Sequence, residues 1–133
     1  MRLRLEGRLP FVAATLGFGG QELTFERVLL DTGSAASVFA ADAVRDLGIE
    51  PAGEDIIRRI RGVGGAEFVY SKRVESLAVG SMLVGDFEVQ IGAMEYGFPL
   101  QGLLGMDFLL ATRAVIDLGG LEIRPAAPSP PQG

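Results

Sequence analysis

The sequence predicts an all-β domain with one or two short helices. Short apolar and β-branched runs recur along the 133 residues, and turn-forming residues, among them 19 glycines, separate these runs. A chain of this length buries about two-thirds of its unfolded surface, which suits one compact core rather than two. We expect one domain over residues 1–124. The Pro-rich residues 125–133 have little to bury and are expected to form a disordered tail.

The first half of the chain alternates apolar runs with turns. Leu3, Leu5 and Leu9 are separated by even intervals, which places them on one face of a strand. The glycine-rich segment 17–20 lies between two apolar runs and predicts a hairpin. Gly48 follows a run of helix formers and would end that helix. The expected elements are a strand through 3–9, strands at 11–16, 23–30 and 37–39, and a helix at 40–47.

The second half continues this pattern. Residues 62–65 lie between two apolar segments and predict a second hairpin with a glycine-rich tip. Residues 80–81 and 119–120 predict two further turns, and 97–102 is expected to be a loop. The expected elements are strands at 56–57, 68–70, 74–79, 84–91, 103–105, 113–118 and 121–124, and a short helix at 106–111.

The composition excludes several kinds of site. The chain has no His and no Cys, so a Ser-His-Asp or Cys-His nucleophilic site is ruled out, as are disulfides and His/Cys zinc sites. Any acid–base chemistry must come from carboxylates, Tyr, Lys, a cofactor or an oxygen-bound metal. The formal net charge of −5 argues against a nucleic-acid partner.

No apolar run approaches the roughly 18 residues that a membrane helix needs. The first six residues alternate charged and apolar side chains and lack the apolar region of a signal peptide. We therefore expect a cytoplasmic protein without a membrane partner.

The most informative segment is 29–38. Asp31 directly follows an apolar strand, where a carboxylate is costly unless it is hydrogen-bonded or paired. Thr32 adds a hydroxyl, and Gly33 allows another group to approach the backbone closely. Because Asp, Gly and Ser all form turns, a simple turn is the alternative interpretation of the tripeptide alone.

A second segment strengthens the first. Leu29–Ser34 has the form of the active-site loop of the retropepsin-like aspartic proteases, and Leu103–Leu109 is similar to their second apolar-Gly element and short helix. The chain thus resembles this family of single-lobe relatives of pepsin, of the bacterial or ubiquitin-linked type, over residues 9–124. The family's flap hairpin lies between the two elements, and here the matching residues are Arg61, Gly62, Val63, Gly64 and Gly65.

The resemblance implies a closed, barrel-like fold that acts as a homodimer. The chain has a single Asp-Thr-Gly, so each subunit would contribute one Asp31 to a catalytic pair. Two carboxylates about 3 Å apart cannot both ionise, so they share one proton. One would take a proton from water and the other would protonate the carbonyl oxygen of an extended peptide lying under two flaps. This chemistry requires neither a cofactor nor a metal.

The resemblance also implies supporting roles in the loop. Thr32 would hydrogen-bond across the dimer axis, and Gly33 would let the two loops meet, with its amide near the pair. Ser34 would donate to the carboxylate and favour its ionised form. We therefore expect an acidic to mildly acidic optimum for peptide cleavage.

Several alternatives remain open. Asp107 could partner Asp31 within one chain, but a solvated or cap-forming carboxylate is the better interpretation, because Asp107 falls inside the predicted helix. Arg58, Arg59 and Arg61 could attract acidic substrate segments, although a solvated hairpin explains them as well.

The fold could also persist as a catalytically silent dimerisation or peptide-binding module, because fold does not decide function. A third possibility is a monomer that needs a fused or separate partner to complete its site. A phosphoryl-acceptor or magnesium site at Asp31 is disfavoured, because Asp42 and Asp46 lie on the predicted helix, away from the strand end.

Overall fold

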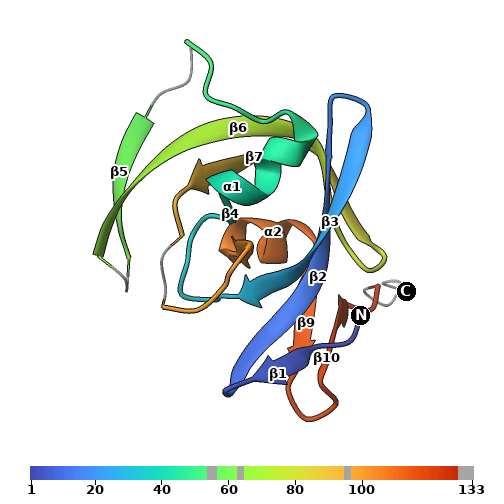
Figure 1. Cartoon of the computed structure of the whole chain (residues 1–133). Coiled ribbons are helices and arrows are strands. Elements are labelled where there is room, and N and C mark those ends of the chain that lie inside the picture. Colours follow the sequence, from blue (N-terminus) through green and yellow to red (C-terminus); the bar gives the residue numbers. More distant parts are fainter. Residues whose placement is uncertain (54–56, 63–64, 95–96, 129–133) are drawn as a thin grey trace.

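The computed structural model describes residues 1–53, 57–62, 65–94 and 97–128 (Figure 1). The fold is mostly β, with few and short helices, as the sequence predicts. The strands are β1 (Arg4–Glu6), β2 (Leu9–Phe18), β3 (Gln21–Leu30), β4 (Val38–Ala40), β5 (Ile57–Gly62), β6 (Gly65–Val79), β7 (Met82–Gly92), β8 (Gly102–Leu104), β9 (Ala114–Asp117) and β10 (Glu122–Pro125). The helices are α1 (Ala41–Val44), the 3₁₀ turn η1 (Arg45–Leu47) and α2 (Met106–Ala111).

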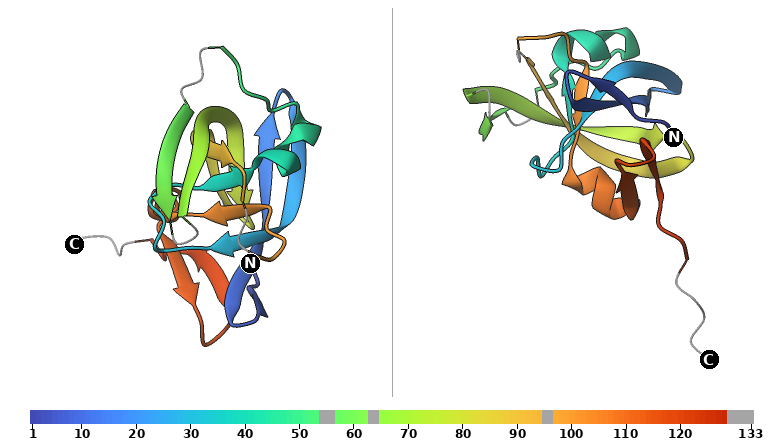
Figure 2. Two further views of the ribbon diagram at one scale, coloured as in Figure 1. Left: turned by 60° about the vertical axis from the view of Figure 1, so that its left-hand side comes forward. Right: turned by 90° about the horizontal axis from the view of Figure 1, so that it is seen from below.

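Eight strands form one sheet in the order β1-β2-β3-β8-β4-β7-β6-β5, and β2 also pairs with β6 (Figure 2). Most neighbours are antiparallel, but β3 runs parallel to β8 and β4 runs parallel to β7. The strand β8 pairs parallel with β3 and antiparallel with β4, and it lies at the centre of the sheet order. The strands β9 and β10 form a separate two-stranded sheet.

The predicted hairpins are present, with longer strands than the sequence suggested. Gly19 and Gly20 have φ values of 60° and 79° and make the turn between β2 and β3, where residues with side chains would be strained. The 15-residue strand β6 pairs with β5 at one end and with β7 at the other. The two strands expected at 68–70 and 74–79 are therefore one strand, because the antiparallel pairing with β7 extends from Val69 to Val79.

The N-terminal expectation was wrong in part. Gly7 and Arg8 have φ values of 55° and 68°, and the turn that they make ends β1 at Glu6. Leu3 is buried, but Leu5 and Leu9 are 51% and 37% exposed, so the three do not share a core face. The reversal of the chain at Gly7 breaks the period-two relation across it.

The ends of the described chain lie side by side. The amide of Leu3 donates to the carbonyl of Leu121, and the amide of Ile123 donates to Met1. Arg2 forms a bridge with Glu122, so the first residues extend the β9–β10 sheet. The strand β10 continues to Pro125, and the amide of Ala126 donates to the carbonyl of Arg113, which carries the ordered chain past the predicted start of the tail.

The main core lies between the sheet and the two helices and contains Phe25, Phe39 and Phe108. Phe11 is also buried, but it belongs to a smaller cluster with Leu100 and Leu103. Phe87 packs edge-on against Phe108, and the side chain of Phe68 lies outside the described part of the chain. The smaller cluster is important below, because it lies against the strand that leads to Asp31.

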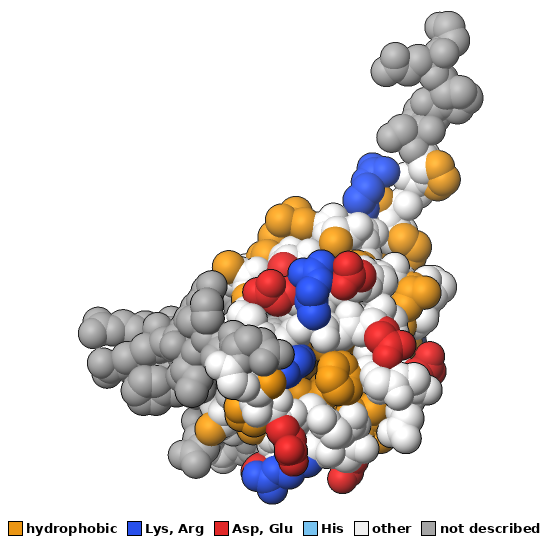
Figure 3. Space-filling model, turned by 90° about the horizontal axis from the view of Figure 1, so that it is seen from above, with side chains coloured by type: hydrophobic (Ala, Val, Ile, Leu, Met, Phe, Trp, Pro, Cys, Tyr) orange, Lys and Arg blue, Asp and Glu red, His pale blue; other side chains and the backbone are white. Residues whose placement is uncertain are grey.

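The surface of the described chain mixes charges of both signs. Figure 3 shows Lys and Arg side chains beside Asp and Glu side chains on one face. Within the described residues, no helix combines the length and the apolar character needed to cross a membrane.

Candidate active site

Asp31 lies where β3 leaves the sheet. The parallel pairing of β3 with β8 ends at Leu30 and Leu104, and the amide of Asp31 adds one more bond by donating to the carbonyl of Leu104 at 3.0 Å. The backbone of the loop is thus anchored to the central strand of the sheet. The side chain of Asp31 is half-buried, whereas Thr32 and Gly33 are exposed.

The loop holds one oxygen of this carboxylate. The amide of Gly33 donates to Asp31 Oδ1 at 2.9 Å, and the amide of Ser34 donates to the Asp31 carbonyl at 3.1 Å. Among the described residues, Oδ2 has no hydrogen-bond partner within the chain. The carboxylate is therefore oriented by its own loop, with one oxygen left for another group.

The role expected of Ser34 is not realised within this chain. Its hydroxyl donates to the carbonyl of Ala36 at 2.7 Å. A hydroxyl has one hydrogen, so Ser34 cannot also donate to Asp31. The hydrogen bond to the Asp31 carboxylate comes instead from the backbone amide of Gly33, and the Ser34 hydroxyl bonds within the turn.

The second element packs directly beneath this loop. The amides of Met106 and Asp107 donate to the carbonyls of Ser34 and Ala35 at 2.8 and 3.1 Å. Gly105 makes the approach possible, because a Cβ atom there would lie 2.5 Å from the carbonyl oxygen of Ala36. Two segments that are distant in the sequence are thus locked together through their backbones.

Asp107 joins the same two segments with its side chain. Its carboxylate accepts hydrogen bonds from the Ser37 amide at 3.0 Å, the Ser37 hydroxyl at 2.7 Å and the Phe108 amide at 2.7 Å. Ser37 is fully buried, and its hydroxyl oxygen accepts from the Gly105 amide at 3.0 Å. Because both oxygens of Asp107 are bonded in this way, it is a structural carboxylate and does not pair with Asp31.

Sequence reasoning missed Ser37 as a partner of Asp107. The two residues are 70 positions apart, and the sequence alone gave no reason to pair them. The signal in the sequence was weak: Ser37 is a small hydroxyl residue at the start of an apolar strand, and Asp107 is a carboxylate two residues after Gly105.

The predicted flap is a hairpin. The strands β5 and β6 pair antiparallel from Ile57 and Tyr70 to Gly62 and Gly65. Figure 1 shows β5 at one side of the molecule, away from α2, and the long strand β6 running from β5 across the molecule. Val63 and Gly64, at the predicted tip, lie outside the described residues, as do the side chains of Arg58, Arg59 and Arg61.

Two carboxylates outside this loop have altered titration. A hydrogen bond from Arg73, reinforced by its charge, lowers the pKa of Asp86. The Gly120 amide, with Arg124 nearby, lowers the pKa of Asp117. Both groups are solvent-exposed and lie outside the candidate site: Asp86 pairs with Arg73 across β6 and β7, and Asp117 accepts from Gly120 in the turn between β9 and β10.

A family model described as aspartyl protease matches residues 12–108, a span that contains the Asp31 loop, the β5–β6 hairpin and the Gly105–Asp107 element. No curated protein matches the chain.

Proposed function

Because the chain belongs to the aspartyl protease family, we propose that it is an endopeptidase that works as a homodimer. Each subunit would contribute one Asp31 to a pair that activates water. The hydrolase class follows from the family, and the dimeric two-carboxylate mechanism is our proposal.

One observation supports the dimer above all others. Asp31 has one oxygen bonded to Gly33 and one oxygen without a partner among the described residues, beside the exposed Thr32. The one carboxylate that packs against the same loop, Asp107, is fully engaged by Ser37 and Phe108. The second acid of the pair is therefore best supplied by Asp31 of another copy.

The pair would hydrolyse a peptide bond with one shared proton. The ionised carboxylate takes a proton from water as the water oxygen bonds to the peptide carbonyl carbon. The protonated carboxyl gives its proton to the carbonyl oxygen, so a neutral diol forms. The C–N bond then breaks as the amide nitrogen receives a proton from the pair and a diol hydroxyl returns one.

The substrate would be a polypeptide in extended form. Such a chain can bind by backbone hydrogen bonds as an added strand, and in our proposal the β5–β6 hairpin would cover it. Residues Arg61, Gly62, Val63, Gly64 and Gly65 would form this cover. Gly33 would bring its amide close to the pair, and Thr32 would join the two loops across the axis.

The decisive experiment replaces Asp31 with Asn. We expect Asp31→Asn to reduce cleavage of a peptide library about a thousandfold or more, because Asn cannot carry the shared proton. Sedimentation should show an unchanged dimer. Asp46→Asn, at an exposed carboxylate of η1, is the matched control and should cleave normally.

Undiminished cleavage by the Asp31 variant would reject this role. If the wild-type dimer neither cleaves peptides nor binds pepstatin-like inhibitors, the silent binding module is favoured instead. A pH–rate profile with its maximum above neutrality would contradict the shared-proton mechanism, because the macroscopic pKa values of the pair set both limbs.

A further inference from the structure

The segment that leads into β8 is held to β3 by its backbone. We call Gly97–Gln101 the wall loop. The Gln101 amide donates to the Arg27 carbonyl at 2.9 Å, and the Arg27 amide donates to Gln101 Oε1, also at 2.9 Å. Arg27 lies four residues before Asp31, so the wall loop is attached to the strand that carries the candidate catalytic group.

The side chain of Arg27 makes further contacts with three other segments. Its Nε donates to the carbonyl of Pro99 at 2.8 Å. Its guanidinium also forms an ion pair with Glu6 of β1 and lies 4.7 Å above the ring centroid of Phe11 of β2. The side chain is only 29% exposed, so these partners replace much of the water that a guanidinium requires.

An apolar contact holds the wall loop from its other end. Phe98 packs edge-on against Phe11, with ring centroids 6.4 Å apart. Leu100 and Leu103 complete this cluster. Arg27 and Phe11 thus hold the wall loop together. The guanidinium of Arg27 lies over the Phe11 ring, and Phe98 of the wall loop packs against the same ring.

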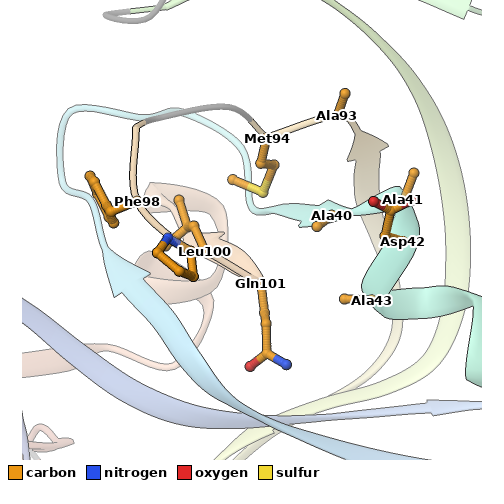
Figure 4. A pocket seen from close by; sticks show the side chains of 10 residues that line it. Ala40, Ala41, Asp42, Ala43, Ala93, Met94, Phe98, Leu100 and Gln101 are labelled. Atoms are coloured by element: carbon orange, nitrogen blue, oxygen red, sulfur yellow. The ribbon is translucent and has the colours of Figure 1, made fainter.

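The wall loop forms one side of a pocket of about 450 Å³ (Figure 4). Phe98, Leu100 and Gln101 lie on one side, and Ala40 and Ala43 lie on the other. Most of the lining residues are apolar, with Asp42 and Gln101 as polar members, and the small residues on the β4–α1 side leave room for a side chain from outside.

The pocket lies within reach of the candidate catalytic loop. Gln101 is three residues before Leu104, whose carbonyl binds the Asp31 amide. Strands rise about 3.3 Å per residue, so the separation along β8 is about 10 Å. A peptide that is extended at Asp31 would cover this distance with about three residues.

We infer that Arg27 is a positioning residue that fixes the wall loop and thereby sets the affinity for substrate. This inference rests on the proposed protease function. The side chain of Arg27 contacts Pro99, Glu6 and Phe11 and acts on the pocket through them, in addition to the backbone bonds that join Arg27 to Gln101. Its loss should therefore weaken substrate binding and leave the acid–base chemistry unchanged.

The experiment uses Arg27→Met in the full chain, which keeps the apolar stem and removes the donors. We expect KM for a cleaved peptide to rise about five- to tenfold, the size of one or two lost hydrogen bonds. The value of kcat should stay within about twofold, and the pH profile should not move. Arg27→Lys should restore part of the affinity.

The matched control is Arg73→Met. Arg73 likewise pairs with a carboxylate and donates to a backbone carbonyl, both belonging to Asp86, but it lies on β6 and does not contact the wall loop. We expect its KM to equal that of the wild type. An equal rise of KM in both variants would overturn the inference, as would a fall of kcat or a shifted pH profile in Arg27→Met.

A second readout does not depend on catalysis. Hydrogen exchange at the Leu100 and Gln101 amides should accelerate about fivefold in Arg27→Met and stay unchanged in Arg73→Met. Unchanged exchange in both variants would refute the positioning role. If the wild type cleaves no peptide, the proposed function fails, and exchange still decides whether Arg27 holds the wall loop.

Discussion

Asp31 and Asp107 follow equivalent apolar strand ends, and their loops contact one another, but their carboxylates are used differently. Asp31 follows β3, and among the described residues its carboxylate accepts one hydrogen bond, from the Gly33 amide. Asp107 comes soon after β8 and accepts three hydrogen bonds, from Ser37 and Phe108. The comparison teaches that the hydrogen bonds to the two carboxylate oxygens, and not the position after a strand, distinguish the roles. A carboxylate with both oxygens hydrogen-bonded is structural, and one with an oxygen left over is available for chemistry.

The two carboxylates also depend on each other. Ser37 and Asp107 hold the Gly105 segment against the Asp31 loop, so the orientation of Asp31 is maintained by a group that takes no part in the proposed reaction. Three substitutions test this division of roles, from the largest expected effect on stability to the smallest.

The largest effect is expected at Gly105, where the two loops touch. In Gly105→Ala the new Cβ would meet the Ala36 carbonyl oxygen at 2.5 Å and the Ser34 carbonyl oxygen at 2.9 Å. Because both obstacles are backbone, the free energy of unfolding should fall by about 3 kcal/mol in urea titrations. Gly53→Ala, where nothing lies within 4 Å, is the control and should be nearly neutral. Equal stability of the two variants would show that the loops are not locked.

An intermediate effect is expected at Asp107. Asp107→Ala leaves the buried Ser37 hydroxyl and amide without their acceptor, which should lower the free energy of unfolding by about 2 kcal/mol. Asp107→Asn keeps one acceptor oxygen and should lose less. Below its melting temperature the Asn variant should still cleave peptide, unlike Asp31→Asn. Loss of cleavage in a folded Asp107→Asn dimer would contradict the division of roles.

The smallest effect is expected at Asp117, which holds a turn as Asp107 does but in solvent. The Gly120 amide, then Arg124, lowers its folded pKa below the unfolded value of 3.8. Ionised Asp117 therefore stabilises the fold above that value, and this stabilisation is lost as the pH falls through the lowered folded pKa. Melting temperatures of Asp117→Asn should lie slightly below wild type at pH 6 and converge with it near pH 2. A constant difference across this range would exclude the ionisation as its cause.

The sequence predicted elements wherever local signals agreed. Gly19 and Gly20 marked a hairpin, and Gly48 ended a helix in a left-handed conformation. Asp31 stood out because a carboxylate after an apolar strand needs a reason.

The missed features depend on partners that are distant in the chain. Asp107 finds Ser37, and Arg27 finds Pro99, only after β3 and β8 have paired. Ser34 was assigned to the wrong acceptor, because the turn brings the Ala36 carbonyl to its hydroxyl. Periodicity likewise failed at Gly7, where the chain reverses.

The length of β6 has a mechanical consequence. No loop interrupts this strand between its pairing with β5 and its pairing with β7, and Val69 and Tyr70 belong to both ladders. Movement of the hairpin end must therefore bend the strand near these residues instead of swinging on a hinge. Tyr70 pairs with Ile91, and Ile91 pairs with Phe39 of β4, so this bending would be transmitted as torsion to the strand that follows the Asp31 loop.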